Sequence, residues 1–93
     1  MKINSGRRTR IDLYADIIKT IESAPSGPMQ KTALMEAANV NPRDRNRIME
    51  EMRAKELIQE VYRRSSGKEI HYITTKKGRI FLRAYELMKE YLT

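Results

Sequence analysis

Apolar residues at the start of the chain recur at the spacing of an amphipathic helix. They stand three, four and three positions apart, at Ile11, Tyr14, Ile18 and Ile21. Thr9, followed three positions later by Asp12, forms a T-x-x-D pattern typical of a capped helix N-terminus. The sequence APSGPM that comes later contains two prolines and a glycine, which favour turns and extended backbone. The pattern predicts a helix from about Arg10 to Ser23.

Two shorter helices are predicted next. The sequence QKTALMEAANV predicts a short helix that stops near Asn39, a residue that tolerates left-handed geometry. Its small apolar surface consists of Ala33, Leu34, Ala37 and Ala38. Asn41 then suits the N-cap of a third helix, with Pro42 at the first position and Asp44 at the third. We expect this helix to run to about Lys55. Its narrow apolar stripe is Ile48, Met49 and Met52.

The period changes after Leu57. The sequences LIQEVYR and IHYIT are rich in β-branched and aromatic residues, and the polar sequence RSSGKE connects them. This pattern predicts a two-stranded hairpin with a connection of about six residues. Which face of each strand points inward stays open, because positions of both parities carry apolar side chains.

A final helix, capped by Thr75, is predicted from about Lys76 to Leu92. It carries two neighbouring apolar seams. The first seam is Ile80, Ala84, Leu87 and Tyr91, and the second is Phe81, Tyr85, Met88 and Leu92. Since one seam suffices for the core of a small domain, the breadth of the stripe indicates a helix packed partly against a second subunit.

Length and composition restrict the class of protein. A chain of 93 residues with 40% hydrophobic and 33% charged residues fits one compact globular domain. It contains no cysteine, which excludes disulfides, cysteine nucleophiles and cysteine-ligated zinc. No apolar run approaches a signal peptide or a membrane span, so we expect a cytoplasmic protein without a membrane partner.

The net charge is +7 and the pI is about 9.9. A small basic domain attracts polyanions, and nucleic acid is the first candidate among them. Better solubility and binding to acidic lipid are the alternative explanations of such a charge.

The order helix, helix, turn, helix, hairpin, helix is that of a winged helix-turn-helix. The sequence resembles small archaeal winged-helix transcription regulators and chromatin proteins that dimerise through a C-terminal helix. Three sequences carry the resemblance: MQKTALMEAANV, NPRDRNRIMEEMRAKELI and HYITTKKGRIFL. The positions of Met49, Met52, Leu57 and Ile58 match the family's L-x-x-L-x-x-x-G-L-I pattern, and TKKG matches its T-x-K-G turn.

The resemblance implies a fold class and a domain organisation. The class is α+β, mainly α, with a two-stranded β wing and a C-terminal dimerisation helix. Residues 1–9 form a basic N-terminal arm, residues 10–75 the DNA-binding domain, and residues 76–93 the dimerisation helix.

Two positions depart from the family pattern. Glu56 stands where glycine usually follows the recognition helix, so we expect a strained or differently shaped turn. Arg45 stands where the family often has an apolar residue. On a helix, Arg45 falls within about 20° of the direction of Met52, on the buried side. We expect its aliphatic part to pack there and its guanidinium to reach a phosphate or an acidic neighbour.

The third helix carries the candidate DNA-reading side chains. Four side chains project from the side opposite its apolar stripe: Arg43, Asn46, Arg47 and Glu50. In winged-helix proteins that resemble this one, such a face enters the major groove, where arginine can read guanine and asparagine can read adenine. The alternative is a solvated face in which Arg43 and Arg47 pair with Glu50 and Glu51.

Other basic elements support the DNA interpretation. At the N-terminus of the second helix, Gln30, Lys31 and Thr32 could donate to a phosphate. The hairpin tip carries Arg63, Arg64 and Lys68, and the N-terminal arm carries Arg7, Arg8 and Arg10. In this architecture the wing and a basic arm usually contact the minor groove or the backbone.

Enzymatic chemistry is not indicated. The single histidine, His71, lacks a second histidine or cysteine for a transition-metal site, and we expect it on the surface or in the wing. The sequence SSGKE lacks the frame of a nucleotide-binding loop. The six methionines are typical core residues. We therefore predict no enzyme, no cofactor, no metal and no small-molecule ligand.

These observations lead to a hypothesis with two alternatives. The first is a homodimeric regulator of transcription that binds double-stranded DNA, with the recognition helix in the major groove and the wing on the minor groove or backbone. The second is an architectural chromatin protein that tolerates many sequences. The third is a winged-helix adaptor that binds another protein.

Overall fold

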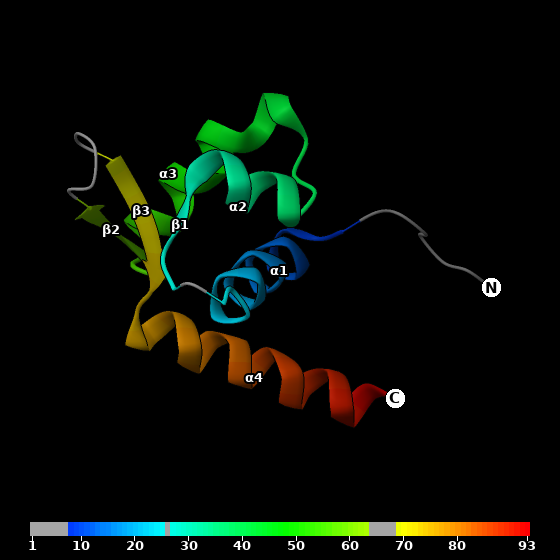
Figure 1. Ribbon diagram of the computed structural model, residues 1–93. Helices are drawn as coiled ribbons and strands as arrows, with labels where there is room; N and C mark the ends of the chain where they lie inside the picture. Colours follow the sequence, from blue (N-terminus) through cyan, green and yellow to red (C-terminus); the bar gives the residue numbers. More distant parts are fainter. Residues whose placement is uncertain (1–7, 26, 64–68) are drawn as a thin grey trace.

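The computed structural model describes residues 8–25, 27–63 and 69–93. Four α-helices, a short 3-10 helix and three strands follow one another (Figure 1). They are α1 (Arg10–Glu22), β1 (Met29–Gln30), α2 (Lys31–Ala37), η1 (Pro42–Asp44), α3 (Arg45–Ala54), β2 (Ile58–Arg63), β3 (Glu69–Thr74) and α4 (Lys76–Leu92). The predicted order of helices and hairpin, and with it the winged-helix fold class, is confirmed. In Figure 1, α1 lies between the α2–α3 pair on one side and α4 on the other.

The predicted helix starts are confirmed by their hydrogen bonds. The backbone N–H of Asp12 donates to the Thr9 hydroxyl at 3.1 Å, and the N–H of Thr9 donates to the Asp12 carboxylate at 3.1 Å. The Asn41 side chain accepts from the N–H of Arg43 at 3.1 Å, and the Thr75 hydroxyl accepts from the N–H of Gly78 at 2.9 Å. Side-chain acceptors thus replace the carbonyls that the first N–H groups of a helix lack.

The third predicted helix begins differently from expectation. Pro42–Asp44 is a 3-10 turn, in which the Asp44 N–H donates to the Asn41 carbonyl at 2.9 Å, and α3 begins at Arg45. Such tighter turns are frequent at helix N-termini, and apolar spacing does not distinguish them from α-helix. Asn39 has a φ of 57°, which confirms the predicted left-handed end of α2.

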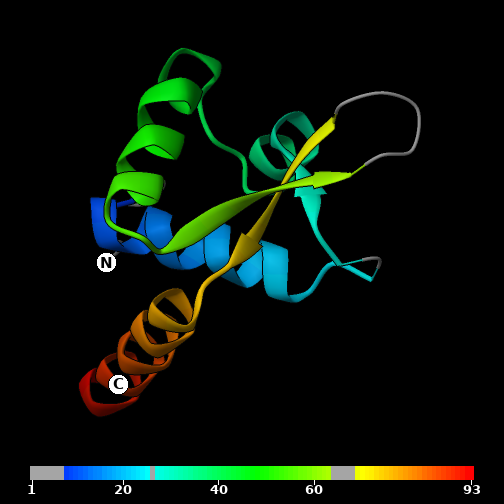
Figure 2. The ribbon, with the colours of Figure 1, turned by 90° about the vertical axis from the view of Figure 1, so that its left-hand side faces the viewer.

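The sheet has a third strand that the sequence did not predict. Met29 and Gln30 pair antiparallel with Tyr72 and His71, which gives the strand order β1-β3-β2. The assignment of Gln30 to the second helix was therefore wrong, whereas the extended backbone at Met29 agrees with the turn and extended conformations predicted for APSGPM. A strand of two residues shows no alternation, and only its backbone pairing with β3 defines it. Figure 2 shows β2 and β3 running together away from the helices.

The hairpin register settles which face is buried. Ile58 pairs with Thr74, Glu60 with Tyr72, and Tyr62 with Ile70, so these six residues share one face. Ile58, Tyr72 and Thr74 are buried at the base of the hairpin. Towards its open end the same face is uncovered, because Tyr62 and Ile70 are exposed.

The core lies where α1, α2, α3 and the base of the hairpin meet. Its fully buried large side chains are Ile17, Ile18, Leu34, Met35, Ile48, Met52 and Ile58. The core role of the methionines is confirmed for Met35, Met49 and Met52, whereas Met88 is exposed. Ile11, the first residue of the predicted stripe of α1, is also exposed.

One seam of α4 faces the core, and the other faces solvent. Phe81 packs edge-on against the ring of Tyr14 of α1, with 6.3 Å between the ring centres. One turn later the Tyr85 hydroxyl donates to the Asp12 carboxylate of α1. The exposed residues of α4 include Ile80, Leu87, Tyr91, Met88 and Leu92. The inner seam thus contacts α1 through Phe81 and Tyr85, while Met88 and Leu92, later in the same seam, are exposed.

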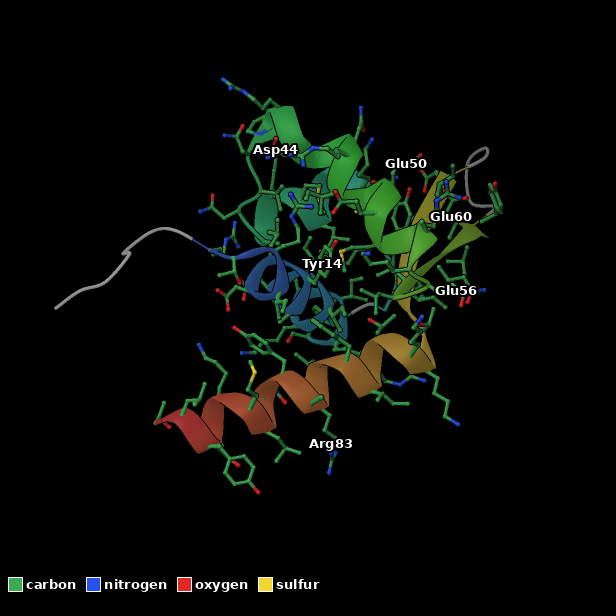
Figure 3. The ribbon with its side chains drawn as sticks, turned by 180° about the vertical axis from the view of Figure 1, so that it is seen from behind. Tyr14, Asp44, Glu50, Glu56, Glu60 and Arg83 are labelled. Atoms are coloured by element: carbon green, nitrogen blue, oxygen red, sulfur yellow. The ribbon has the colours of Figure 1, made fainter. Side chains whose placement is uncertain are left out.

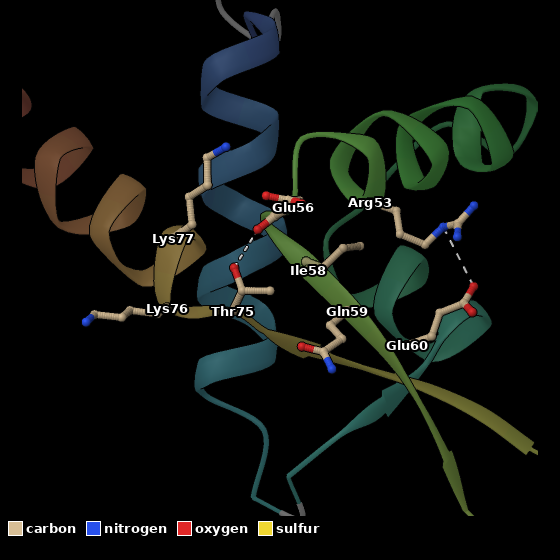
Figure 4. A pocket seen from close by; sticks show the side chains of 8 residues that line it. All are labelled: Arg53, Glu56, Ile58, Gln59, Glu60, Thr75, Lys76 and Lys77. Carbon is tan, nitrogen blue, oxygen red and sulfur yellow. Dashed lines mark hydrogen bonds and ion pairs between the residues drawn. The ribbon is translucent and has the colours of Figure 1, made fainter.

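A close contact joins the turn after α3 to the start of α4 (Figure 4). Glu56 has a φ of 60°, so the turn expected to be strained without glycine is left-handed. Its carbonyl accepts from the Thr75 hydroxyl at 2.6 Å, as Figure 4 shows. The Thr75 N–H donates to the Leu57 carbonyl at 3.2 Å. A β-carbon on Gly78 would lie 2.2 Å from that same carbonyl oxygen, so only glycine fits there.

Gly78→Ala should therefore destabilise the fold although alanine is the better helix former. In an open helix this change would stabilise by about 1 kcal/mol, but overlap with the Leu57 carbonyl should instead cost about 2 kcal/mol or more. Urea unfolding measures the difference, with Arg83→Ala, an exposed change in the same helix, as the control. An unchanged or higher stability for Gly78→Ala would contradict the close contact.

Tyr85→Phe should lower stability in a pH-dependent way. The Tyr85 hydroxyl, together with the Thr9 cap, lowers the pKa of the Asp12 carboxyl, and the same bond raises the pKa of Tyr85 to about 12. A carboxyl whose pKa is lower in the folded state contributes stability that is present above its unfolded pKa of about 4 and is lost as pH falls through the folded value. We expect Tyr85→Phe to lower the melting temperature by roughly 4 °C at neutral pH.

This difference should narrow as the pH falls below about 3. Tyr62→Phe, which removes an exposed hydroxyl from the hairpin, is the control and should behave like the wild type. Thermal unfolding followed by circular dichroism at several pH values measures both. A difference between Tyr85→Phe and wild type that stays constant with pH would show that the hydroxyl does not act through Asp12.

Candidate nucleic-acid interface

The outer face of α3 carries the side chains predicted to read DNA. Asn46, Arg47 and Glu50 of α3 are exposed, and so is Arg43, which lies in η1 just before the helix; Ile48, Met49 and Met52 are buried on the other side of α3. Figure 3 shows Asp44 of η1 and Glu50 of α3 at the opposite end of the molecule from Arg83 of α4. The predicted division of this helix into a buried and an exposed face is confirmed.

The start of α2 lies beside this face. The ammonium group of Lys31 donates to the side-chain oxygen of Asn46, so two predicted DNA-contacting residues from different helices meet. Gln30 and Thr32, which flank Lys31, are exposed. Gln30 is the N-cap of α2 but makes no side-chain capping bond. This end of α2 therefore offers a half-buried lysine and two exposed polar side chains next to α3.

Arg47 has acidic partners on its own helix and turn. Its guanidinium lies 2.8 Å from the Asp44 carboxylate and 3.9 Å from that of Glu51. The alternative of a self-paired face is thus realised for Arg47 and Glu51. Glu50 instead lies 3.5 Å from Arg53. The Arg47 side chain keeps 53% of its surface exposed, so it can still meet a ligand in front of the helix.

Arg45 turns towards the body of the protein, as predicted. Its Nε donates to the Val40 carbonyl at 3.0 Å, and the residue is half-buried. The partner is a backbone carbonyl rather than the phosphate or acidic side chain that the sequence suggested. The Val40 carbonyl follows the end of α2 and gains from Arg45 the donor that a helix would otherwise supply.

Arg8 and Arg10 are held by the folded domain rather than by a free arm. Arg8 donates to the Ala38 carbonyl at 2.8 Å and to the Asn39 carbonyl at 2.6 Å, and it pairs with Asp16 at 2.9 Å. A cation at the end of α2 also suits the dipole of that helix. Arg8, which the sequence assigned to the basic arm, is thus bonded to α1 and to the end of α2. Arg7 lies outside the described residues.

Arg10 contacts a hydrogen-bonded cluster that the sequence did not reveal. Its guanidinium contacts both carboxylate oxygens of Glu51, one of them at 2.7 Å, and the hydroxyl of buried Tyr14 donates to the same carboxylate at 2.7 Å. The bonds from Tyr14 and Arg10 lower the pKa of Glu51. Burial, followed by the bond to Glu51, raises the pKa of Tyr14. Residues 37 positions apart in sequence leave no local pattern by which this contact could be predicted.

The structure describes the candidate wing residues only in part. β2 ends at Arg63, whose backbone pairs with Glu69. Arg64 and Lys68 lie outside the described residues. His71, expected on the surface or in the wing, is half-buried in the central strand, between Gln30 and Val61.

An open groove of about 520 Å³ lies between the end of α3, β2 and the start of α4 (Figure 4). Its charged lining residues are Arg53, Glu56, Glu60, Lys76 and Lys77. Arg53 lies 3.8 Å from Glu60, so part of this charge is paired within the groove. Within residues 8–25, 27–63 and 69–93, no three acidic or histidine side chains gather as a metal site would require. In the same part of the chain no helix has the length and apolar character needed to cross a membrane.

Comparisons with solved structures place the fold among bacterial regulators. The chain is similar to diamide-treated YodB from B. subtilis, with a TM-score of 0.71 and 16% identity over 92% of this chain and 79% of that chain. A PadR family transcription regulator from Clostridium difficile R20291 is similar with a TM-score of 0.67 and 18% identity, over 85% of this chain and 90% of that chain. The MarR family transcriptional regulator SPO1453 from Silicibacter pomeroyi is similar with a TM-score of 0.61 and 16% identity, over 92% of this chain and 57% of that chain.

At these identities the similarity concerns the fold alone. No curated protein sequence gives a significant match. The archaeal type of regulator and the dimer named from the sequence stay predictions. The winged helix-turn-helix family model, however, matches residues 7–93, which is nearly the whole chain. The chain therefore belongs to the winged helix-turn-helix family.

Proposed function

We propose that this protein is a transcription regulator without enzymatic activity that binds double-stranded DNA as a homodimer and recognises a specific sequence. The observation that carries the proposal is the exposed face of η1 and α3, where Arg43 of η1 and Asn46 and Arg47 of α3 are exposed while Ile48, Met49 and Met52 of α3 are buried. Arginine matches the two major-groove acceptors of guanine, and asparagine matches the donor and acceptor of adenine. A helix presented in this way fits the major groove.

Further contacts to phosphates complete the proposed interface. Lys31 lies beside Asn46, and Gln30 and Thr32 are exposed next to it. The wing residues Arg63, Arg64 and Lys68 and the arm residue Arg7 would add cations along the minor groove or backbone. The net charge of +7 supports this assignment. We do not include Arg8, Arg10 and Arg45, because their guanidinium groups bond to partners within the chain.

The outer seam of α4 is the proposed dimer interface. Ile80 is 59% exposed, Leu87 48% and Tyr91 85%, and they lie on the side of α4 away from α1. Two copies of such a seam can cover each other about a two-fold axis. Three other predicted interface residues, Ala84, Met88 and Leu92, are also exposed. The remaining two, Phe81 and Tyr85, are half-buried and pack largely against other residues of the same chain. Two recognition helices related in this way would read two half-sites on DNA. A regulator that binds DNA in this way would be cytoplasmic and associated with the nucleoid.

Arg43→Ala should weaken specific DNA binding. We expect roughly a tenfold or greater loss of affinity for a duplex selected from a random pool, because a bidentate contact to guanine would be lost. Lys19→Ala removes the same charge from an exposed position of α1, outside the proposed interfaces, and should change affinity less than about twofold. Fluorescence anisotropy with the selected duplex and with a random duplex measures both variants.

The same measurements separate the alternatives. Equal losses for Arg43→Ala on selected and random duplexes, with no sequence enriched from the pool, would indicate an architectural DNA-binding protein. An affinity that stays flat between about 50 and 200 mM salt would contradict binding to DNA and leave the adaptor hypothesis.

Leu87→Glu should convert a dimer into a monomer. The new carboxylate would be buried against the apolar seam of the second subunit without a partner, which is strongly unfavourable. Gln59→Glu adds the same charge at an exposed position of β2 and should stay dimeric. Size-exclusion chromatography with light scattering at tens of micromolar distinguishes the two states. A wild-type monomer at that concentration would refute the interface.

A further inference from the structure

Two side chains of α1 hold the carboxylate of Glu51 in α3. The Tyr14 hydroxyl donates to it at 2.7 Å, and the Arg10 guanidinium, one turn earlier on α1, contacts both of its oxygens. Glu51 is only 27% exposed, and the whole Tyr14 residue is 6% exposed. The hydroxyl has little freedom, because the ring of Tyr14 is buried and packs edge-on against Phe81 of α4.

Glu51 in turn faces Arg47, one helical turn before it on α3. Its second carboxylate oxygen lies 3.9 Å from the Arg47 guanidinium, whose other side lies 2.8 Å from Asp44. A chain of contacts therefore runs from the buried ring of Tyr14 through Glu51 to an arginine on the exposed face. The bonds from Tyr14 and Arg10 also lower the pKa of Glu51.

We propose that Tyr14 is a positioning residue for DNA recognition: its hydroxyl orients Glu51, and Glu51 together with Asp44 holds the Arg47 guanidinium in place at the outer face of α3. The proposal rests on the proposed function, because it assigns Arg47 its use on DNA. It adds a buried residue of another helix to the determinants of specificity.

The physical benefit is that Arg47 is ordered before DNA arrives. A free arginine side chain loses much rotamer freedom when it binds a base, and this loss weakens binding. Two carboxylates already restrict Arg47, while about half of its surface stays open to a ligand. The carboxylates also repel DNA, so the arrangement favours the correct contact at guanine more than general attraction to the backbone.

The first test observes Arg47 in the free protein. In full-length protein labelled with ¹⁵N-arginine, the order parameter of the Arg47 Nε–H group should fall in Tyr14→Phe. Tyr85→Phe is the matched control, because it also removes a tyrosine hydroxyl that donates to a carboxylate of another helix. In this case the carboxylate is that of Asp12 in α1, not that of Glu51 in α3. An order parameter that is unchanged in Tyr14→Phe, or that falls equally in both variants, would overturn the proposal.

The second test is a double-mutant cycle on the selected duplex. We expect Tyr14→Phe to lower affinity roughly threefold or more in the wild type and not at all in the Arg47→Ala background, as coupled residues behave. Affinity for a random duplex should stay within about twofold of the wild type. An equal loss in both backgrounds would show that Tyr14 supports the fold alone, and would overturn the proposal.

A second variant keeps the test decisive if Tyr14→Phe proves unstable. Glu51→Gln keeps the size of the side chain and an oxygen for Tyr14, but it removes the charge that faces Arg47. It should disorder Arg47, bind random DNA more tightly because one repelling charge is lost, and discriminate less between the two duplexes. Unchanged discrimination with unchanged order at Arg47 would overturn the proposal. If the wild type binds no duplex, the proposed function fails, and the order of Arg47 alone still decides whether Tyr14 positions it.

Discussion

The close approach of Gly78 to the Leu57 carbonyl is the constraint on which the arrangement of this domain depends. At this point the chain leaves α3 for the hairpin, and the hairpin returns to start α4. The Thr75 side chain bonds to the Glu56 carbonyl and caps α4, and its N–H bonds to the Leu57 carbonyl. Because the first turn of α4 is held against Glu56 and Leu57, directly before β2, the direction of α4 and the direction of the wing are set together.

Helix α1 occupies the position between the two surfaces that the proposed function requires. On one side it receives Phe81 and Tyr85 of α4, and on the other it holds Glu51 of α3. Two tyrosines make these contacts: the hydroxyls of Tyr14 and Tyr85 each donate to a carboxylate of a different helix. The proposed dimer seam on α4 and the proposed reading face on α3 are therefore joined through one rigid element. In the proposed dimer, α1 would connect the interface on α4 to the reading face on α3, and would thereby help to set the distance between the two recognition helices.

Local chemistry was sufficient to predict most of the elements. The caps at Thr9, Asn41 and Thr75 depend on a side chain bonding to a backbone group two or three residues away, and all three are present. The left-handed residue Glu56 was also indicated, because its position in the pattern normally holds glycine. The strand β1 and the 3-10 start of the third helix escaped prediction, since two or three residues carry no periodicity.

The sequence by itself determined the order of the four helices and the hairpin, the buried and exposed sides of α3, and the double seam of α4, because each element shows in the spacing of its own apolar residues. Only the tertiary structure decided which partner each charged side chain takes. Arg8, Arg10 and Arg45 all suggested contacts to DNA, yet each bonds within the chain. Their partners are carbonyls and carboxylates that folding brings near, and composition cannot show where a guanidinium finds its nearest acceptor.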